Sequence, residues 1–203
     1  GYTASKLLWF RNAHADLYAQ MDCILLPHDY VNFYLTGEKT MEAGDASGTG
    51  FMDVRARQWS QQMLGIVDPN TDLRDRLPRI GTSMAPIGKL LPSVASELGL
   101  PPGIPVAPGG GDNMMGAIGT GNVKPGVVTM SLGTSGTIYS YADASVTDPN
   151  GDIAAFCSST GGWLPLICTM NCTAGTQLMQ DLFATTISQF EANLQISAHG
   201  AQG

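Results

Sequence analysis

The sequence predicts a mixed α/β fold, and three observations support this prediction. Hydrophobic residues make up 43% of the 203 residues and charged residues only 13%, so the chain can bury a substantial core. Up to about residue 122, stretches with helical spacing alternate with a short apolar run and polar turns. Beyond that point, β-branched and aromatic residues between glycine turns indicate hairpins. The change of pattern therefore predicts two domains, residues 1–122 and 123–203.

The first region is expected to contain helices and one strand. Apolar residues at helical spacing predict helices over residues 3–18 (with a break near Asn12), 28–37, 54–64 and 92–99. Gly37 is a typical C-terminal stop for the second helix, and Asp53 is suited to be the N-cap of the third. The apolar run "CILLP" at residues 23–27 indicates a short buried strand that ends at Pro27.

The second region is expected to consist of strands followed by a helix. The segment "GVVTMSLGTSGTIYSYA" (126–142) predicts two strands separated by the turn "GTSG". Two further strands are expected at "DIAAFCSS" (152–159) and "WLPLICTM" (163–170), with a turn between them. Thr173 is expected to cap a final helix.

Charge and composition exclude several classes of partner. The net charge of −7 and the isoelectric point near 4.7 argue against nucleic acid, because no basic stripe is available to neutralise phosphates. No apolar run approaches the length of a membrane helix. Four scattered cysteines are too few for a disulfide scaffold in a chain of this length. We therefore expect a cytoplasmic protein with neither a nucleic-acid nor a membrane partner.

Two glycine-rich turns are the best candidates for a ligand site, "GGGDN" (109–113) and "GTSG" (133–136). Neither matches the dinucleotide fingerprint or the P-loop. The "GTSG" turn would present backbone N–H groups and two hydroxyls to phosphate oxygens, although a plain hairpin turn is the commoner explanation of such a segment taken alone. In "GGGDN", Asp112 could accept a proton from a bound hydroxyl, or it could simply cap the helix that follows.

Other polar residues form no recognisable constellation in the sequence. Cys168 and Cys172 are four residues apart with no histidine nearby, which argues against a metal site. The three histidines, His14, His28 and His199, lie in separate segments without a nucleophile partner in the sequence.

Four ordered stretches carry a resemblance to a known family. They are "LLPHDYVNFYLTGE" (25–38), "DASGTGFMDVRARQWS" (45–60), "GIPVAPGGGDNMMGAIGTG" (103–121) and "SLGTSGTIY" (131–139). In order and spacing they resemble the FGGY family of carbohydrate kinases, and within it the branch that phosphorylates D-xylulose. The resemblance covers residues 1 to about 185. It implies two actin-like, ribonuclease-H-type domains with the active site in the cleft between them. Residues 1–122 would then end the N-terminal kinase domain, and residues 123–203 would begin the C-terminal one.

The resemblance also implies roles for individual residues. Asp112 would be the base that deprotonates a pentulose hydroxyl, yielding D-xylulose 5-phosphate, and Asn113 would hydrogen-bond the sugar. Gly133, Thr134, Ser135 and Gly136 would contact the phosphates of ATP. Mg²⁺ would bridge these phosphates near Asp112, directly or through water. A homodimer is a candidate assembly.

Several features of the family are missing from this sequence. The N-terminal Asp-containing glycine turn, the early Met-His-Gly-Gln stretch and the C-terminal glycine-rich segment that holds adenosine are not found in it. We therefore expect the chain to be the central portion of a longer kinase, and to be inactive alone. The alternative is a truncated, non-catalytic piece that acts as a structural or interaction module.

Overall fold

The computed structural model describes residues 2–198 and 200, and the chain divides into two compact units. The first unit comprises Gly1–Thr129 and Tyr139–Leu166. The second comprises Met130–Ile138 and Ile167–Gly203.

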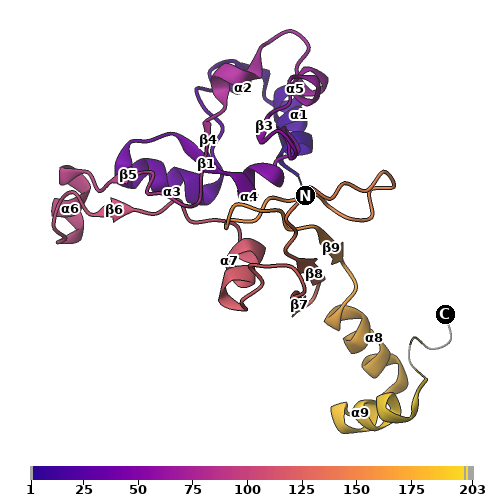
Figure 1. Ribbon diagram of the computed structural model, residues 1–203. Coiled ribbons are helices and arrows are strands. Elements are labelled where there is room, and N and C mark those ends of the chain that lie inside the picture. Colours follow the sequence, from indigo (N-terminus) through magenta and orange to yellow (C-terminus); the bar gives the residue numbers. More distant parts are fainter. Residues whose placement is uncertain (1, 199, 201–203) are drawn as a thin grey trace. The chain divides into compact units, whose positions relative to one another are not determined.

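Short helices and two-residue to three-residue strands alternate along the first part of the chain (Figure 1). The helices are α1 (Thr3–Ala13), α2 (Ala15–Ala19), α3 (Pro27–Thr36), α4 (Ala43–Ser47), α5 (Gln61–Val67), α6 (Pro92–Leu98) and α7 (Asp112–Gly119), with a 3-10 turn, η1 (Leu73–Arg76). The strands are β1 (Thr40–Glu42), β2 (Met52–Asp53), β3 (Gln58–Trp59), β4 (Arg79–Gly81), β5 (Gly88–Lys89) and β6 (Pro105–Val106).

These strands pair two by two. β1 and β4 are parallel, with Thr40 opposite Arg79, whereas β2–β3 and β5–β6 are antiparallel. Farther along the chain, β7 (Val128–Leu132), β8 (Gly136–Ser140) and β9 (Leu166–Thr169) form a three-stranded sheet in the order β7-β8-β9. The helices α8 (Thr173–Phe183) and α9 (Ile187–Ile196) follow in the second unit.

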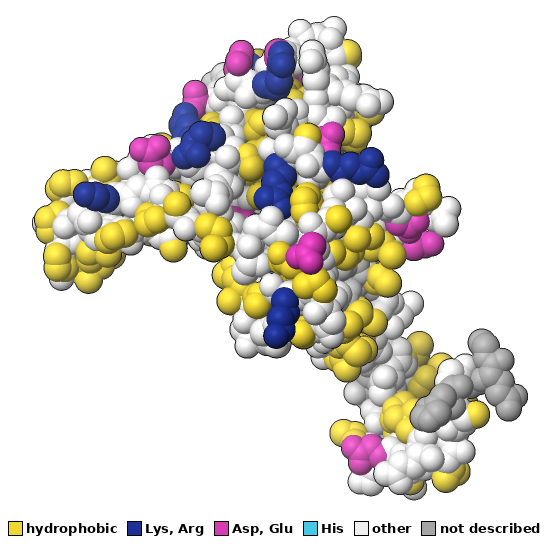
Figure 2. Space-filling model, in the orientation of Figure 1, with side chains coloured by type: hydrophobic (Ala, Val, Ile, Leu, Met, Phe, Trp, Pro, Cys, Tyr) yellow, Lys and Arg dark blue, Asp and Glu magenta, His cyan; other side chains and the backbone are white. Residues whose placement is uncertain are grey.

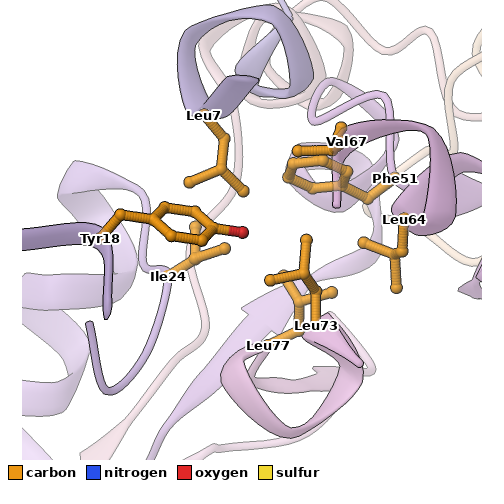
Figure 3. Close-up of a cluster of buried hydrophobic side chains, with 8 residues drawn as sticks. All are labelled: Leu7, Tyr18, Ile24, Phe51, Leu64, Val67, Leu73 and Leu77. Carbon is orange, nitrogen blue, oxygen red and sulfur yellow. The ribbon is translucent and has the colours of Figure 1, made fainter. Parts of the chain in front are cut away.

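A buried hydrophobic cluster packs α1, α2, α5 and η1 together, and Figure 3 labels its side chains. Its members are Leu7, Tyr18, Ile24, Phe51, Leu64, Val67, Leu73 and Leu77. Phe51 and Leu73 are completely buried. The Tyr18 hydroxyl, at the edge of this cluster, donates a hydrogen bond of 2.9 Å to Asp68. The cluster can therefore bury a tyrosine because its polar atom has a partner.

A separate buried cluster anchors α7. Met114 and Ala117 lie on one side of this helix and pack with Tyr139, Leu164 and Leu166. Because residues i and i+3 share a helix face, the two apolar side chains of α7 point into this cluster together. The packing fixes the helix that carries Asp112 at its first position.

The structure confirms some predicted elements of the first region and corrects others. Helices over 28–37 and 92–99 are present as α3 and α6, and Gly37 ends α3 with a φ of 78°. The helix predicted over 3–18 is broken at His14, two residues beyond Asn12, near which the break was expected. Residues 23–26 form no strand, and Pro27 begins α3 because its fixed φ and missing N–H suit the first helical position.

The expected cap at Asp53 is wrong. Its carboxylate accepts the N–H groups of Arg55 and Ala56 in a tight turn, and β3 follows. The helix begins only at Gln61, where Ser60 is the N-cap and its hydroxyl accepts the N–H of Met63. Asp53 thus stabilises a turn through the same kind of side-chain to backbone hydrogen bond that makes aspartate a good helix N-cap.

In the hairpin region, the two strands around "GTSG" are confirmed as β7 and β8. The segment 152–159 makes isolated bridges through Ala154 and Cys157 in place of a strand, and only residues 166–169 of the last predicted strand are extended into a ladder. Thr173 is the first residue of α8, and Cys172 occupies the N-cap.

On the face drawn in Figure 2, Lys and Arg side chains lie in separate patches among acidic and apolar ones. Among residues 2–198 and 200, no helix combines the length and apolar character that a bilayer-spanning segment needs. All four cysteines are free thiols.

Candidate active site

The glycine loop between β6 and α7 is anchored from α3. The side chain of Asn32, buried on α3, donates a hydrogen bond of 2.7 Å to the carbonyl of Pro108 at the start of the loop. Gly109 then adopts a φ of +71°, a conformation that favours glycine over residues with a side chain. The loop therefore leaves the strand along a path that α3 holds in place.

The next two glycines are required by close contacts. A Cβ on Gly110 would lie 2.7 Å from the hydroxyl oxygen of Ser159 and 2.8 Å from the terminal carbon of Met115. A Cβ on Gly111 would lie 2.5 Å from Oδ1 of Asp45. These separations are below van der Waals contact, so the loop packs against its neighbours at a distance that only glycine allows.

Asp112 and Asn113 occupy the first turn of α7. Gly111 is the N-cap, and Asp112 is the first helical residue. Its Oδ1 accepts the N–H of Asn113 at 2.8 Å, so the interpretation of Asp112 as the helix cap is wrong. The Asp112 residue is exposed, whereas Asn113 is half-buried. A carboxylate at this end of a helix is favoured by the helix dipole, which leaves it ordered and open to a ligand.

Tyr139 lies within electrostatic reach of Asp112. Burial of the phenol, and then the negative charge of Asp112, raise the pKa of Tyr139 above its ordinary value. A Cβ on Gly116 would lie 2.7 Å from the Tyr139 hydroxyl oxygen, so this side chain lies against the middle of α7. Asp112 therefore presents an exposed carboxylate on a helix whose opposite side is tightly packed.

A second group of polar side chains lies behind the glycine loop, and the sequence did not indicate it. His28, at the start of α3, places Nδ1 2.6 Å from Oδ2 of Asp45 and Nε2 3.3 Å from Oδ1 of Asp29. Glu42, at the end of β1, accepts the N–H of Asp45 at 3.2 Å and a hydrogen bond from the hydroxyl of Ser83. Asp29 is adjacent to His28 in the sequence, whereas Asp45 is 17 residues away. No regular spacing therefore indicates this cluster.

Burial and charge shift the protonation of this group. Asp29 is completely buried, and desolvation raises its pKa to about 6, against the opposing effect of His28. The hydrogen bond to Asp45 raises the pKa of His28 above its ordinary value, and Asp29 and Glu42 add to this effect. The acidic neighbours of His28 therefore favour its protonated form over the neutral one.

The "GTSG" turn (133–136) connects β7 to β8. Thr134 and Ser135 are exposed. The N–H of Gly133 donates to the carbonyl of Ser135 at 3.0 Å, so this one N–H is already used within the turn. Thr173, the first residue of α8, donates both its N–H (3.0 Å) and its hydroxyl (2.7 Å) to the Gly133 carbonyl. The turn is thereby fixed beside the N-terminus of an 11-residue helix, an arrangement that suits anions.

The remaining candidates stay outside these groups. His14 separates α1 from α2 and packs edge-on against Trp9 with ring centroids 5.3 Å apart. His199 lies outside the residues that the structure describes. Within the described ranges, no group of three or more His, Cys, Asp and Glu residues could hold a metal ion. An exposed carboxylate such as Asp112 nevertheless fits Mg²⁺, which is commonly held by one or two carboxylates, water and substrate phosphates.

Comparison with known proteins decides the family. A sequence profile described as the FGGY family of carbohydrate kinases, N-terminal domain, matches residues 1–119. The chain belongs to this FGGY family of carbohydrate kinases. The FGGY relatives include a xylulose kinase of Haemophilus influenzae, 44% identical over 203 residues that make up 100% of this chain and 41% of the relative. A xylulose kinase of Escherichia coli is 38% identical over 77% of this chain and 32% of the relative.

Solved structures of FGGY kinases share the fold. A xyloylose kinase from Brucella ovis superposes with a TM-score of 0.85 at 30% identity, covering 95% of this chain and 39% of that one. A xylulose kinase from Rhodospirillum rubrum gives a TM-score of 0.87 at 22% identity, covering 100% of this chain and 42% of that one. The actin-like, ribonuclease-H-type fold expected from the resemblance is therefore confirmed. The chain spans about a third to two fifths of the length of these FGGY kinases.

Proposed function

We propose that this chain forms part of an ATP-dependent kinase that phosphorylates a pentulose, with D-xylulose as the substrate and D-xylulose 5-phosphate as the product. The observation that carries the proposal is the exposed carboxylate of Asp112 on the first turn of α7, directly after three glycines. Membership of the FGGY family and the names of the relatives from Haemophilus influenzae and Escherichia coli support the class of reaction and the choice of sugar.

In this proposal Asp112 is the general base. Its carboxylate accepts the proton of a sugar hydroxyl while the hydroxyl oxygen forms a bond to the γ-phosphorus of ATP. The bond from that phosphorus to the β–γ bridging oxygen breaks, and ADP leaves with the electron pair. The glycines at 109–111 carry no side chains, so the sugar can approach the backbone closely, and Asn113 hydrogen-bonds another hydroxyl.

The nucleotide is assigned to the second glycine turn. Gly133, Thr134, Ser135 and Gly136 would contact the phosphates, supported by the two exposed hydroxyls and by the helix N-terminus that Thr173 brings to the turn. Asp112 would hold Mg²⁺ directly or through water. When bound, the ion neutralises charge on the phosphates. We also propose that residues 1–122 and 123–203 belong to the N-terminal and C-terminal kinase domains, and that the enzyme is a cytoplasmic homodimer.

The proposal is tested in a hybrid kinase, in which residues 1–203 replace the matching 41% of the Haemophilus influenzae relative. Coupled detection of ADP release should show turnover with D-xylulose and little with glycerol or gluconate. The 203-residue chain alone should show no sugar-dependent release of ADP, because it spans too little of the relatives to complete both substrate sites. A correctly folded hybrid without D-xylulose-dependent turnover would contradict the proposal and favour a non-catalytic module.

A further inference from the structure

His28 and Asp45 form the surface on which the glycine loop rests. Oδ2 of Asp45 is 2.6 Å from Nδ1 of His28, while Oδ1 of the same carboxylate lies 2.5 Å from the position that a Cβ on Gly111 would occupy. The ring of His28 lies against the loop as well, because a Cβ on Gly109 would be 3.5 Å from its Cδ2. One imidazole and one carboxylate therefore contact the loop at its first and last glycines.

Asp45 has little freedom to move away from the loop. Its side chain is held by His28, and its backbone N–H donates to the Glu42 carboxylate, which is the hydrogen bond that caps the short helix α4. Gly111, which touches Asp45, is the N-cap of α7 and directly precedes Asp112. A shift of the Asp45 carboxylate is therefore transmitted through one residue to the position of Asp112.

We infer that His28 and Asp45 act together as positioning residues that hold Gly111, and through it the Asp112 carboxylate, in the geometry needed for proton transfer. This inference rests on the proposed role of Asp112 as the base. Reacting groups must be placed within a fraction of an ångström, and displacements of about 1 Å can cost about 100-fold in rate. Neither positioning residue needs to touch the sugar or the nucleotide.

The charge of His28 makes the arrangement dependent on pH. The groups that face its imidazole are Asp29 on α3, Asp45 on α4 and Glu42 at the end of β1, and all three are acidic. The Asp45 hydrogen bond raises the pKa of His28, so the imidazolium persists to a higher pH than it would without this partner. When the pH rises through this raised pKa, the positive charge between the carboxylates is lost. Asp45 then loses its charge-assisted hydrogen bond, and the loop loses its fixed support.

Three variants of the hybrid kinase test the inference. His28→Leu leaves Asp45 without its partner, and we expect kcat to fall about 10- to 100-fold while the KM for ATP stays within about twofold. Asp45→Asn should have a similar effect on kcat. His28→Asn keeps an N–H donor close to Asp45 but cannot titrate, so it should restore much of kcat and abolish the fall of kcat at alkaline pH that we expect of the parent. His14→Asn is the matched control, because His14 lies between α1 and α2 and touches neither the loop nor Asp45.

A measurement independent of activity is the NMR titration of the His28 imidazole in the same proteins. We expect its midpoint above the ordinary histidine range in the parent and a lower midpoint in Asp45→Asn. If Asp112→Asn is inactive but His28→Leu and Asp45→Asn turn over like the parent, the inference fails while the proposed function stands. If Asp112→Asn itself turns over normally, the proposed function fails, and the inference fails with it. An alkaline limb that His28→Asn leaves unchanged, or a His28 midpoint that Asp45→Asn leaves unchanged, would also overturn the inference.

Discussion

Replacing Gly111 by alanine tests whether the glycine loop is held by close packing. The added Cβ would lie 2.5 Å from Oδ1 of Asp45 and 3.2 Å from the sulfur of Met114. Asp45 cannot simply swing aside, because its other oxygen is 2.6 Å from His28. Overpacking of this kind costs about 1–3 kcal/mol. The hybrid kinase has about 500 residues, because 203 residues make up 41% of the relative, so each kcal/mol lowers its Tm by only about 1 °C. We therefore expect Gly111→Ala to lower the Tm of the hybrid kinase by about 1–3 °C.

The control for this measurement lies on the same helix. Gly119 ends α7, and no atom lies within 4 Å of the position of its added Cβ, so Gly119→Ala should leave the Tm unchanged or raise it slightly. Thermal unfolding followed by circular dichroism compares the two. In an Asp45→Ala background the cost of Gly111→Ala should shrink by about 0.5 kcal/mol or more, because the colliding oxygen is gone. Equal melting of Gly111→Ala and the parent would refute the argument from close contact.

Three further predictions concern the core, pH and the nucleotide. Tyr18→Phe removes a hydrogen bond of 2.9 Å to Asp68 and leaves this buried carboxylate with one partner fewer, so unfolding by urea should show a loss of about 1–3 kcal/mol. Burial raises the pKa of Asp29 to about 6 from 3.8, so its contribution to stability is full below pH 3.8 and is lost as the pH rises through 6. The Tm of Asp29→Asn should therefore fall less than that of the parent across this interval, and a parallel course of the two curves would contradict the assignment. Thr134→Val in the hybrid kinase should raise the KM for ATP more than the KM for D-xylulose, and the reverse result would exclude "GTSG" as the phosphate turn.

Elements with strong local signals could be predicted from the sequence. The helix over 28–37 combines apolar spacing with a terminal glycine, and the strands around "GTSG" combine β-branched residues with a glycine turn. The strand predicted over 23–27 is wrong because a short apolar segment is compatible with either a strand or the residues that lead into a helix. The N-cap predicted at Asp53 is wrong because an aspartate carboxylate accepts the same backbone N–H hydrogen bond in a turn and at a helix N-cap.

The site was predictable only in part. Asp112 and its glycines are adjacent in the sequence, so their pattern could be read directly. His28, Glu42 and Asp45 come together through the packing of α3, β1 and α4, and no spacing rule indicates it. The close approach of Gly111 to Asp45 explains in physical terms why this loop lacks side chains, which the sequence alone left open.

The central claim is that Asp112 is the base, and the kcat of Asp112→Asn in the hybrid kinase tests it most directly. Asparagine keeps the size of the side chain but cannot accept the proton, so kcat should fall by roughly 10²–10⁴-fold. Binding of D-xylulose measured by calorimetry should stay within about tenfold, because about one hydrogen bond is altered. Asp16→Asn is the matched control, since Asp16 is also an exposed acid in the first turn of a helix but lies outside the site. We expect a normal kcat for Asp16→Asn and a greatly reduced kcat for Asp112→Asn at nearly equal Tm, whereas near-normal turnover of Asp112→Asn would contradict the role of Asp112 as the base.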